Sequence, residues 1–237
     1  MTDRRRPKPP AGLPVLYEDD AVIAVNKPAG LLAVPIKRSS TPSALTVVAE
    51  QLKRKQQRAF VVHRIDRFVS GILLFAKTAR DRHALVEQFL EHTPHREYLT
   101  VVRGQLERES GTLVHYFRRE GFHQELSTPK DRKAARAELS YSVERRFPSA
   151  SLVRVELVTG LQNQIRAQFA ASGHTVIGDR KYRPGEAEER RIERVALHAA
   201  HLGFLHPRTQ ESVAIDCEPP DDFQSLVRQF ALTRGAN

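Results

Sequence analysis

The sequence predicts an α+β fold: a single domain built on a mixed, largely antiparallel central sheet with flanking helices. Two observations support this class. Short segments in which apolar and polar residues alternate with period two follow one another along most of the chain. Only a few segments with helical spacing interrupt them, and no linker-like stretch divides the chain. With 237 residues, of which 40% are hydrophobic, the chain can bury a sizeable core.

The first elements are predicted from the N-terminal quarter of the chain. We expect residues 1–14 to form a basic, flexible arm, because MTDRRRPKPP is polar and interrupted by prolines, and residues 15–237 to form the domain. The segment VLYEDDAVIAV (15–25) predicts two short strands around an acidic turn. A helix is expected within residues 41–57, where apolar residues such as Leu45 recur at helical spacing after a proline.

The next stretch, FVVHRIDRFVSGILLFAKT (60–78), is expected to form a strand, a loop and a second strand. Thr78 with Asp81 three residues later is a helix N-cap pattern. It predicts a helix that extends to about His92 and buries Leu85.

Residues 117–136 are polar, basic and poorly periodic, which predicts a long loop or arm. On both sides of that segment the alternation is clear again. Further strands are predicted at 96–104, 138–147, 151–158, 195–204 and 212–216, and further helices at 163–173 and 221–232.

Charge is the most conspicuous feature of the composition. Lys and Arg number 38 against 28 Asp and Glu, which gives a formal net charge of +10 and an isoelectric point near 10.1. Clusters of this kind attract polyanions such as nucleic acid, although a single cluster is often only a solvated surface. The excess is concentrated in residues 4–8, 53–58, 115–136 and 179–183.

Several classes of protein lose their usual sequence support. No apolar run is long enough for a membrane span or a signal peptide, so we expect a soluble, cytoplasmic protein. The lone Cys217 excludes a disulfide framework, and no dinucleotide-binding, P-loop or nucleophile-elbow motif occurs. His198, His201 and His206 lie close together in sequence, but their spacing suits packing and polar contacts better than a metal site.

Asp66 is the candidate for chemistry, because it stands between Arg64 and Arg67 in a loop flanked by apolar runs. Neighbouring guanidinium groups lower the pKa of a carboxyl by about 1 to 3 units, so we expect this carboxylate to be fully ionised. An ionised carboxylate can act as a nucleophile or stabilise a cation, as at a sugar anomeric centre. From the local sequence alone, a salt bridge that fixes the loop is the favoured interpretation.

Five segments resemble the pseudouridine synthases of the RluA type in the same order, and the resemblance runs from about Val15 to Asp216, nearly the whole chain. The central one, HRIDRFVSGILLFAKT, resembles the family pattern HRLDRDTSGLLL, which carries the catalytic aspartate. The others are NKPAGLLAVP (26–35), REYLTVVRG (96–104), LVTGLQNQIRAQFAASGHTVIGDRKY (157–182) and LHAAHLGFLHP (197–207).

The resemblance implies roles for individual residues. Asp66 takes the position of the catalytic aspartate, either attacking C1′ of a uridine or removing a C2′ proton. Tyr98 takes that of the tyrosine that stacks on the uracil, and Arg166 that of the arginine paired with the aspartate. Arg64 is expected to fill the gap left by the flipped nucleotide. The remaining residues expected to contact the substrate are Arg67, Lys27, Asn163 and Gln164.

The family also implies an active-site cleft lined by basic residues, an RNA partner that is ribosomal or transfer RNA, and no cofactor or metal. A monomer without the N-terminal RNA-binding domain of some relatives is the simplest expectation. Leu161, Asn163, Phe68 and Val69 depart from the family pattern, which puts the choice of substrate in question. Two alternatives remain: an RNA-binding protein that has lost catalysis, and a hydrolase, for which no partner acid is visible.

Overall fold

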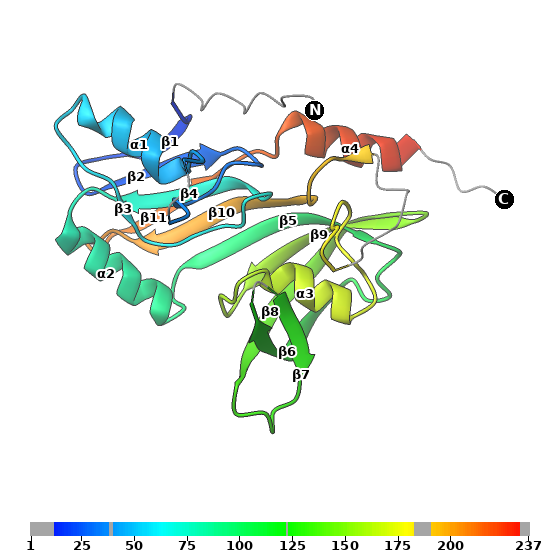
Figure 1. Ribbon diagram of the computed structural model, residues 1–237. Coiled ribbons are helices and arrows are strands. Elements are labelled where there is room, and N and C mark those ends of the chain that lie inside the picture. Colours follow the sequence, from blue (N-terminus) through cyan, green and yellow to red (C-terminus); the bar gives the residue numbers. More distant parts are fainter. Residues whose placement is uncertain (1–11, 38–39, 122, 183–190, 233–237) are drawn as a thin grey trace, which may run out of the picture.

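The computed structural model describes residues 12–37, 40–121, 123–182 and 191–232, and it confirms a single α+β domain on one large sheet (Figure 1). In this part of the chain the sheet has 11 strands, in the order β1-β2-β4-β10-β5-β9-β8-β6-β7, with β3 paired to β4 and β11 to β10. Neighbouring strands are antiparallel except β4 and β10, which are parallel. The strands are β1 (Val15–Glu18), β2 (Val22–Lys27), β3 (Phe60–Val61), β4 (Ser70–Ala76), β5 (His95–Arg103), β6 (Ser110–Glu120), β7 (His123–Ser127), β8 (Ala134–Phe147), β9 (Ala150–Leu157), β10 (Leu197–Leu205) and β11 (Ser212–Asp216).

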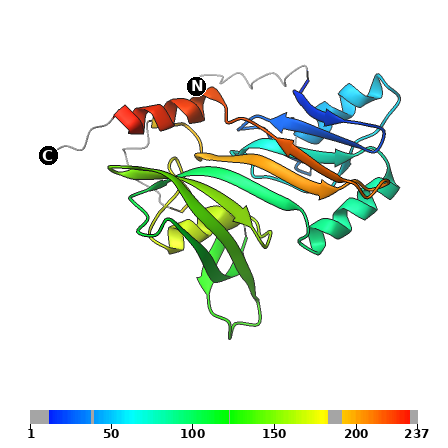
Figure 2. The ribbon, with the colours of Figure 1, turned by 180° about the vertical axis from the view of Figure 1, so that it is seen from behind.

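Two helices cover opposite faces of the β2–β4 part of the sheet (Figures 1 and 2). They are α1 (Ala44–Lys53) and α2 (Ala79–Leu90). Because successive side chains of a strand alternate between faces, β4 contributes Phe75 to the cluster under α1 and Leu74 to the cluster under α2. This double burial explains why every residue of β4 is buried. The predicted cap of α2 is present, since Thr78 accepts from the backbone of Asp81, and Ser43 caps α1 in the same way.

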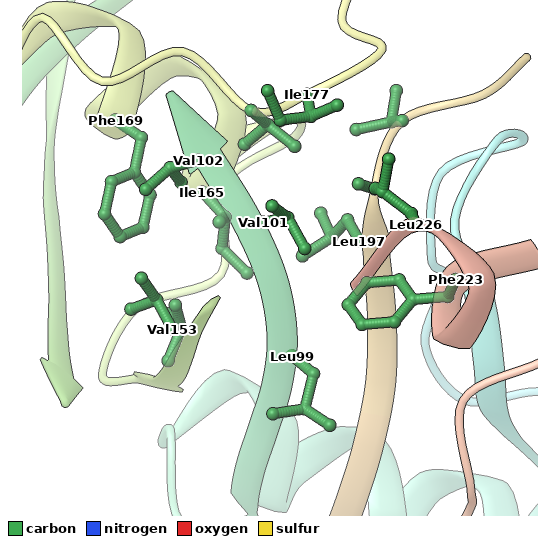
Figure 3. Packing of buried hydrophobic residues seen from close by; sticks show 14 of the residues in the cluster. Leu99, Val101, Val102, Val153, Ile165, Phe169, Ile177, Leu197, Phe223 and Leu226 are labelled. Carbon is green, nitrogen blue, oxygen red and sulfur yellow. The ribbon is translucent and has the colours of Figure 1, made fainter. Parts of the chain in front are cut away.

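The other two helices, α3 (Gln164–Ala171) and α4 (Asp221–Leu232), share the largest buried cluster with β5, β9 and β10 (Figure 3). Phe169 of α3 and Phe223 of α4 are both fully buried there, together with Val101 of β5. The cluster fixes α3 against the sheet, which matters because α3 carries one of the candidate site residues.

The prediction of a long loop over residues 117–136 was wrong. The segment contains the end of β6, all of β7 and the start of β8, and Phe117 pairs with Leu126 of β7 and with Ala135 of β8. Backbone pairing holds these strands although most of their side chains are exposed or half-buried, so they lack the alternation that identifies a strand with one buried face.

Of the expected N-terminal arm, residues 1–11 lie outside the described residues. Leu13 belongs to the fold, since it is only 3% exposed and exchanges two 3.0 Å hydrogen bonds with the Gln51 side chain. The folded domain therefore includes residues before 15. No helix in the described ranges is long and apolar enough to cross a membrane.

Gly71→Ala is expected to destabilise the protein by at least about 2 kcal/mol. Gly71 has a φ of +110°, and a Cβ at this position would lie 2.2 Å from the carbonyl oxygen of Ala199 in β10. Gly173→Ala is the matched control, because Gly173 also has a positive φ (+81°) but no atom within 4 Å of its Cβ position. Urea unfolding of both variants measures the difference, and equal losses would contradict a steric origin.

Candidate active site

Asp66 lies in a tight turn just before β4, and its position follows from the strands around it. The amide of Val69 donates to the carbonyl oxygen of Asp66 at 3.1 Å, which closes the turn. Ser70 and Gly71 then enter the sheet beside β10. The Asp66 side chain remains 25% exposed, so its carboxylate is accessible to a ligand.

Arg166 of α3 is held by a second carboxylate, that of Asp179. Its Nε and Nη2 donate to the two Asp179 carboxylate oxygens, each at 2.7 Å. Gly178, the residue before Asp179, allows the chain to pass close to Arg194, because a Cβ there would lie 1.9 Å from the carbonyl oxygen of Arg194. The Asp179 side chain is completely buried and that of Arg166 is 8% exposed. This bidentate pair fixes the guanidinium plane.

The third guanidinium nitrogen faces Asp66. Arg166 Nη1 lies 3.6 Å from Asp66 Oδ2 and donates to Asn163 Oδ1 at 2.8 Å. Asn163 precedes α3 in a left-handed conformation, with φ of 56°, which asparagine tolerates better than most residues. The expected ion pair between Arg166 and Asp66 is therefore present, while Asn163, expected to contact the substrate, uses its amide oxygen to orient Arg166.

The predicted direction of the Asp66 pKa shift was wrong. Burial raises the pKa of Asp66, and the charges of Arg166 and Lys181 oppose this effect without reversing it. The flanking arginines are not among the charges that act on this pKa, and the Arg67 side chain is directed to Gly30, where its Nε donates to the carbonyl oxygen at 2.8 Å. The carboxylate thus depends on Arg166 rather than on its neighbours in sequence.

Tyr98 lies on β5, where it pairs with Ala199 of β10 and Val155 of β9. Its ring packs against the largest core cluster and is half-buried. Burial raises the pKa of Tyr98 to about 12, with Arg96 opposing and the Asp66 charge adding to the shift. The phenol is consequently neutral at physiological pH and near enough to Asp66 for the two groups to influence each other.

Lys27 does not have the expected substrate-binding position. It is completely buried, and its ammonium donates to the carbonyl oxygens of Pro28 (2.9 Å), Leu31 (2.9 Å) and Arg67 (3.2 Å). An ammonium has three protons, so these bonds use all of them. Lys27 therefore connects the 26–31 segment to the loop that carries Asp66.

Lys27→Met is expected to remove a pH dependence of stability. Burial lowers the pKa of Lys27 from 10.5 to about 7, so above that pH the folded protein binds fewer protons than the unfolded chain. The penalty for burying the charge is full below about pH 7 and is relieved as the pH rises, by at most about 1.4 kcal/mol per pH unit. Urea unfolding between pH 7 and pH 10.5 should show the free energy of unfolding rising more steeply with pH for the wild type than for the variant. Parallel curves would contradict the lowered pKa of Lys27.

Gln164 also differs from its expected role of contacting the substrate. It is 3% exposed, its Oε1 accepts from Thr159 (2.9 Å) and Leu161 (2.8 Å), and its Nε2 donates to Glu138 (3.0 Å) and Gln168 (2.9 Å). Each polar atom of the amide is satisfied within the protein. Gln164 stabilises the turn that leads into α3.

Arg64 and Arg67 are exposed, on the same loop as Asp66. Both can meet a phosphate, although Arg67 also donates to the protein as described above. The site thus combines an accessible carboxylate, a fixed guanidinium, a neutral phenol and exposed cations, a set suited to a sugar–phosphate substrate.

Comparison with known proteins identifies the family of this chain. A model of the family described as RNA pseudouridylate synthase matches residues 21–171. The chain belongs to this family. The match includes Asp66, Tyr98 and Arg166.

Relatives support this membership over nearly the whole chain. The tRNA pseudouridine synthase C of Haemophilus ducreyi is 34% identical over 236 residues, which cover 92% of this chain and 96% of that protein. The ribosomal large subunit pseudouridine synthase D of Zymomonas mobilis is 30% identical and covers 93% of this chain and 74% of its own. The structure of human RNA pseudouridylate synthase domain containing 4 has a TM-score of 0.77 at 19% identity, covering 92% and 93% of the two chains, which shows the shared fold.

Sequence reasoning missed Asp179 as a residue of this pseudouridine synthase site. Two more residues of the same turn contribute: Lys181, whose charge acts on Asp66, and Tyr182, whose ring lies 5.5 Å from the Arg166 guanidinium carbon. The signal was available, since the family segment that contains Arg166 continues into GDRKY. The segment predicts family membership and a basic cluster, but its local pattern does not indicate that the Asp179 carboxylate binds the arginine.

The histidines of the last family segment make structural contacts. His198 is completely buried; its Nε2 donates to the carbonyl oxygen of Cys217 at 2.8 Å, and its Nδ1 accepts from Ser70 at 2.9 Å. His201 pairs with Asp216 at 2.7 Å. Among the residues that the structure describes, no group of three or more His, Cys, Asp or Glu side chains is arranged to hold a metal ion.

Proposed function

We propose that this protein converts uridine into pseudouridine in ribosomal or transfer RNA, with Asp66 as the catalytic carboxylate. The observation that supports the proposal is that the two carboxylates at Arg166 differ in exposure and in their contacts with the guanidinium. Asp179 is completely buried and takes both short bonds, whereas Asp66 is 25% exposed and lies 3.6 Å from the remaining nitrogen. Only Asp66 of this pair can meet a substrate.

The reaction is an isomerisation in which no group is lost. The C1′–N1 bond of the uridine breaks, the uracil turns, and a C1′–C5 bond forms; the proton of C5 leaves to solvent and N1 takes up a proton. Asp66 acts on the ribose, and Arg166 steadies its negative charge. Tyr98 supplies a ring face for the uracil and a neutral hydroxyl for hydrogen bonding. This account needs no cofactor or metal.

The uridine must leave the RNA stack to reach Asp66, which costs about a few kcal/mol. Phosphate contacts with the basic surface offset this cost, and Arg64 occupies the space that the flipped nucleotide leaves. The relatives act on transfer RNA in one case and on ribosomal RNA in another, as their names state, so both are substrate classes for this chain. We further propose that it acts as a monomer in the cytoplasm, where both RNAs are present.

The test is tritium release from RNA labelled at uracil C5, with purified protein and separate pools of unmodified transfer and ribosomal RNA. Release into water is expected from at least one pool, because C5 must lose its hydrogen when it bonds to C1′. Tight, salt-sensitive binding of both pools without release would instead favour an RNA-binding protein that has lost catalysis.

A further inference from the structure

Phe68 is an exposed aromatic residue on the loop that carries Asp66. It is 46% exposed, although its neighbour Val69 is 2% exposed and Ile65 on the other side of the turn is 7% exposed. The apolar side chains that this loop needs for its own anchoring are therefore already buried. Phe68 projects from the loop without contributing to the core clusters.

One face of the ring lies against a cation, although the ring is exposed. The guanidinium carbon of Arg67 lies 5.3 Å from the ring centroid of Phe68, on one face of the ring. Arg67 is itself fixed on both its side chain and its backbone: its Nε donates to the carbonyl oxygen of Gly30, and its own carbonyl oxygen accepts from the amide of Gly30, each at 2.8 Å. Because Arg67 covers one face, the exposed area of the ring lies on its other face and its edges.

The position of this ring relates it to the RNA substrate. Phe68 is two residues after Asp66, so their Cα atoms are at most about 7 Å apart, a distance on the scale of one nucleotide step. Arg64 and Arg67, which are exposed on the same loop, attract phosphates to this place. A flipped uridine leaves its neighbour in the strand without a stacking partner, and aromatic rings stack on bases of any sequence.

We propose that Phe68 stacks on the nucleobase next to the flipped uridine. This inference rests on the proposed function and extends it, since it names a binding residue outside the catalytic group and the chemical class of its ligand. The ring replaces the stacking that base flipping removes, and Arg67 behind it holds the platform rigid.

The first test uses the fact that the chain contains no tryptophan. In Phe68→Trp the new indole is the sole tryptophan, and its fluorescence is expected to be quenched on titration with the transfer or ribosomal RNA pool that the protein binds. Leu205→Trp is the matched control, because Leu205 is 45% exposed but lies at the far end of β10. Quenching of the Phe68→Trp protein alone supports stacking; unchanged fluorescence with saturating RNA overturns it.

The second test compares Phe68→Ala with Phe68→Tyr. Loss of one stacked base weakens binding by about 5- to 150-fold, which corresponds to ~1–3 kcal/mol at ~1.4 kcal/mol per tenfold. We therefore expect KM and Kd for the RNA pool to rise by this factor in the alanine variant and to change little in the tyrosine variant. An alanine variant with wild-type KM and Kd overturns the proposal, as does a tyrosine variant as weak as alanine.

The outcomes also separate this inference from the proposed function. Stacking does not need the reaction, so the Phe68→Trp quench should persist when Asp66→Asn is added. Quenching without tritium release from wild-type protein would support the stacking site and contradict the proposed isomerase activity. Tritium release without quenching, together with a wild-type Kd for Phe68→Ala, would support the isomerase activity and contradict the stacking site.

Discussion

Asp66→Asn is expected to lower kcat for isomerisation by at least about 1,000-fold, because asparagine keeps the shape of the side chain but can neither attack C1′ nor take a proton. Asp179, the other carboxylate at Arg166, cannot substitute for it, since it is completely buried against Arg166. The affinity for RNA should stay within about threefold, since it comes from phosphate contacts elsewhere on the surface. Single-turnover tritium release and filter binding measure the two effects.

The same variant should fold as well as the wild type. Burial raises the pKa of Asp66, which means that the folded state disfavours the charge that asparagine removes. Arg166 also keeps its short bonds to Asp179. Asp20→Asn, in the exposed turn between β1 and β2, is the control with unchanged activity. Retained isomerisation in Asp66→Asn would refute the catalytic assignment.

Asp179→Asn is expected to reduce both stability and catalysis. It leaves the Arg166 guanidinium buried without the partner of its two 2.7 Å bonds, and breaking a buried ion pair costs about 3 to 5 kcal/mol. A guanidinium displaced by even ~1 Å no longer steadies Asp66, so kcat should fall by about 100-fold with little change in KM. Chemical unfolding and steady-state kinetics on the variant measure these effects.

The Arg194–Asp222 pair provides a matched control for that experiment. It has the same bidentate geometry, with distances of 2.6 and 2.9 Å, but the Asp222 side chain is 49% exposed. Asp222→Asn should therefore lose less stability and leave kcat unchanged. If Asp179→Asn behaved in the same way as Asp222→Asn, Asp179 would have no role in positioning Arg166.

The sequence predicted the elements whose side chains have one buried face. Strands β8 and β9 and the capped helix α2 follow the expected pattern, because alternation or helical spacing records burial directly. The β6–β7 hairpin was missed since backbone hydrogen bonds, rather than a buried face, hold it together. Asp66 stood out by its local pattern between two arginines, whereas Tyr98 and Arg166 were found by resemblance alone.

The environment of each site residue was less predictable than its identity. The charges that act on Asp66 come from Arg166 and Lys181, which are distant in sequence, while Arg67 beside it is engaged with Gly30. Lys27, which was expected to bind substrate, is enclosed by three carbonyl oxygens. Such contacts arise only when loops from separate strands meet, and no local pattern records them.

The measurement that tests the account most directly is nucleoside analysis of transfer and ribosomal RNA after incubation with wild-type protein or Asp66→Asn. The RNA is digested completely and the products are separated by liquid chromatography with mass detection. The account predicts pseudouridine, with an equal loss of uridine, from the wild type and none from the variant. Free uracil with abasic sites would show a hydrolase, and pseudouridine from the variant would show that Asp66 is not the catalytic residue.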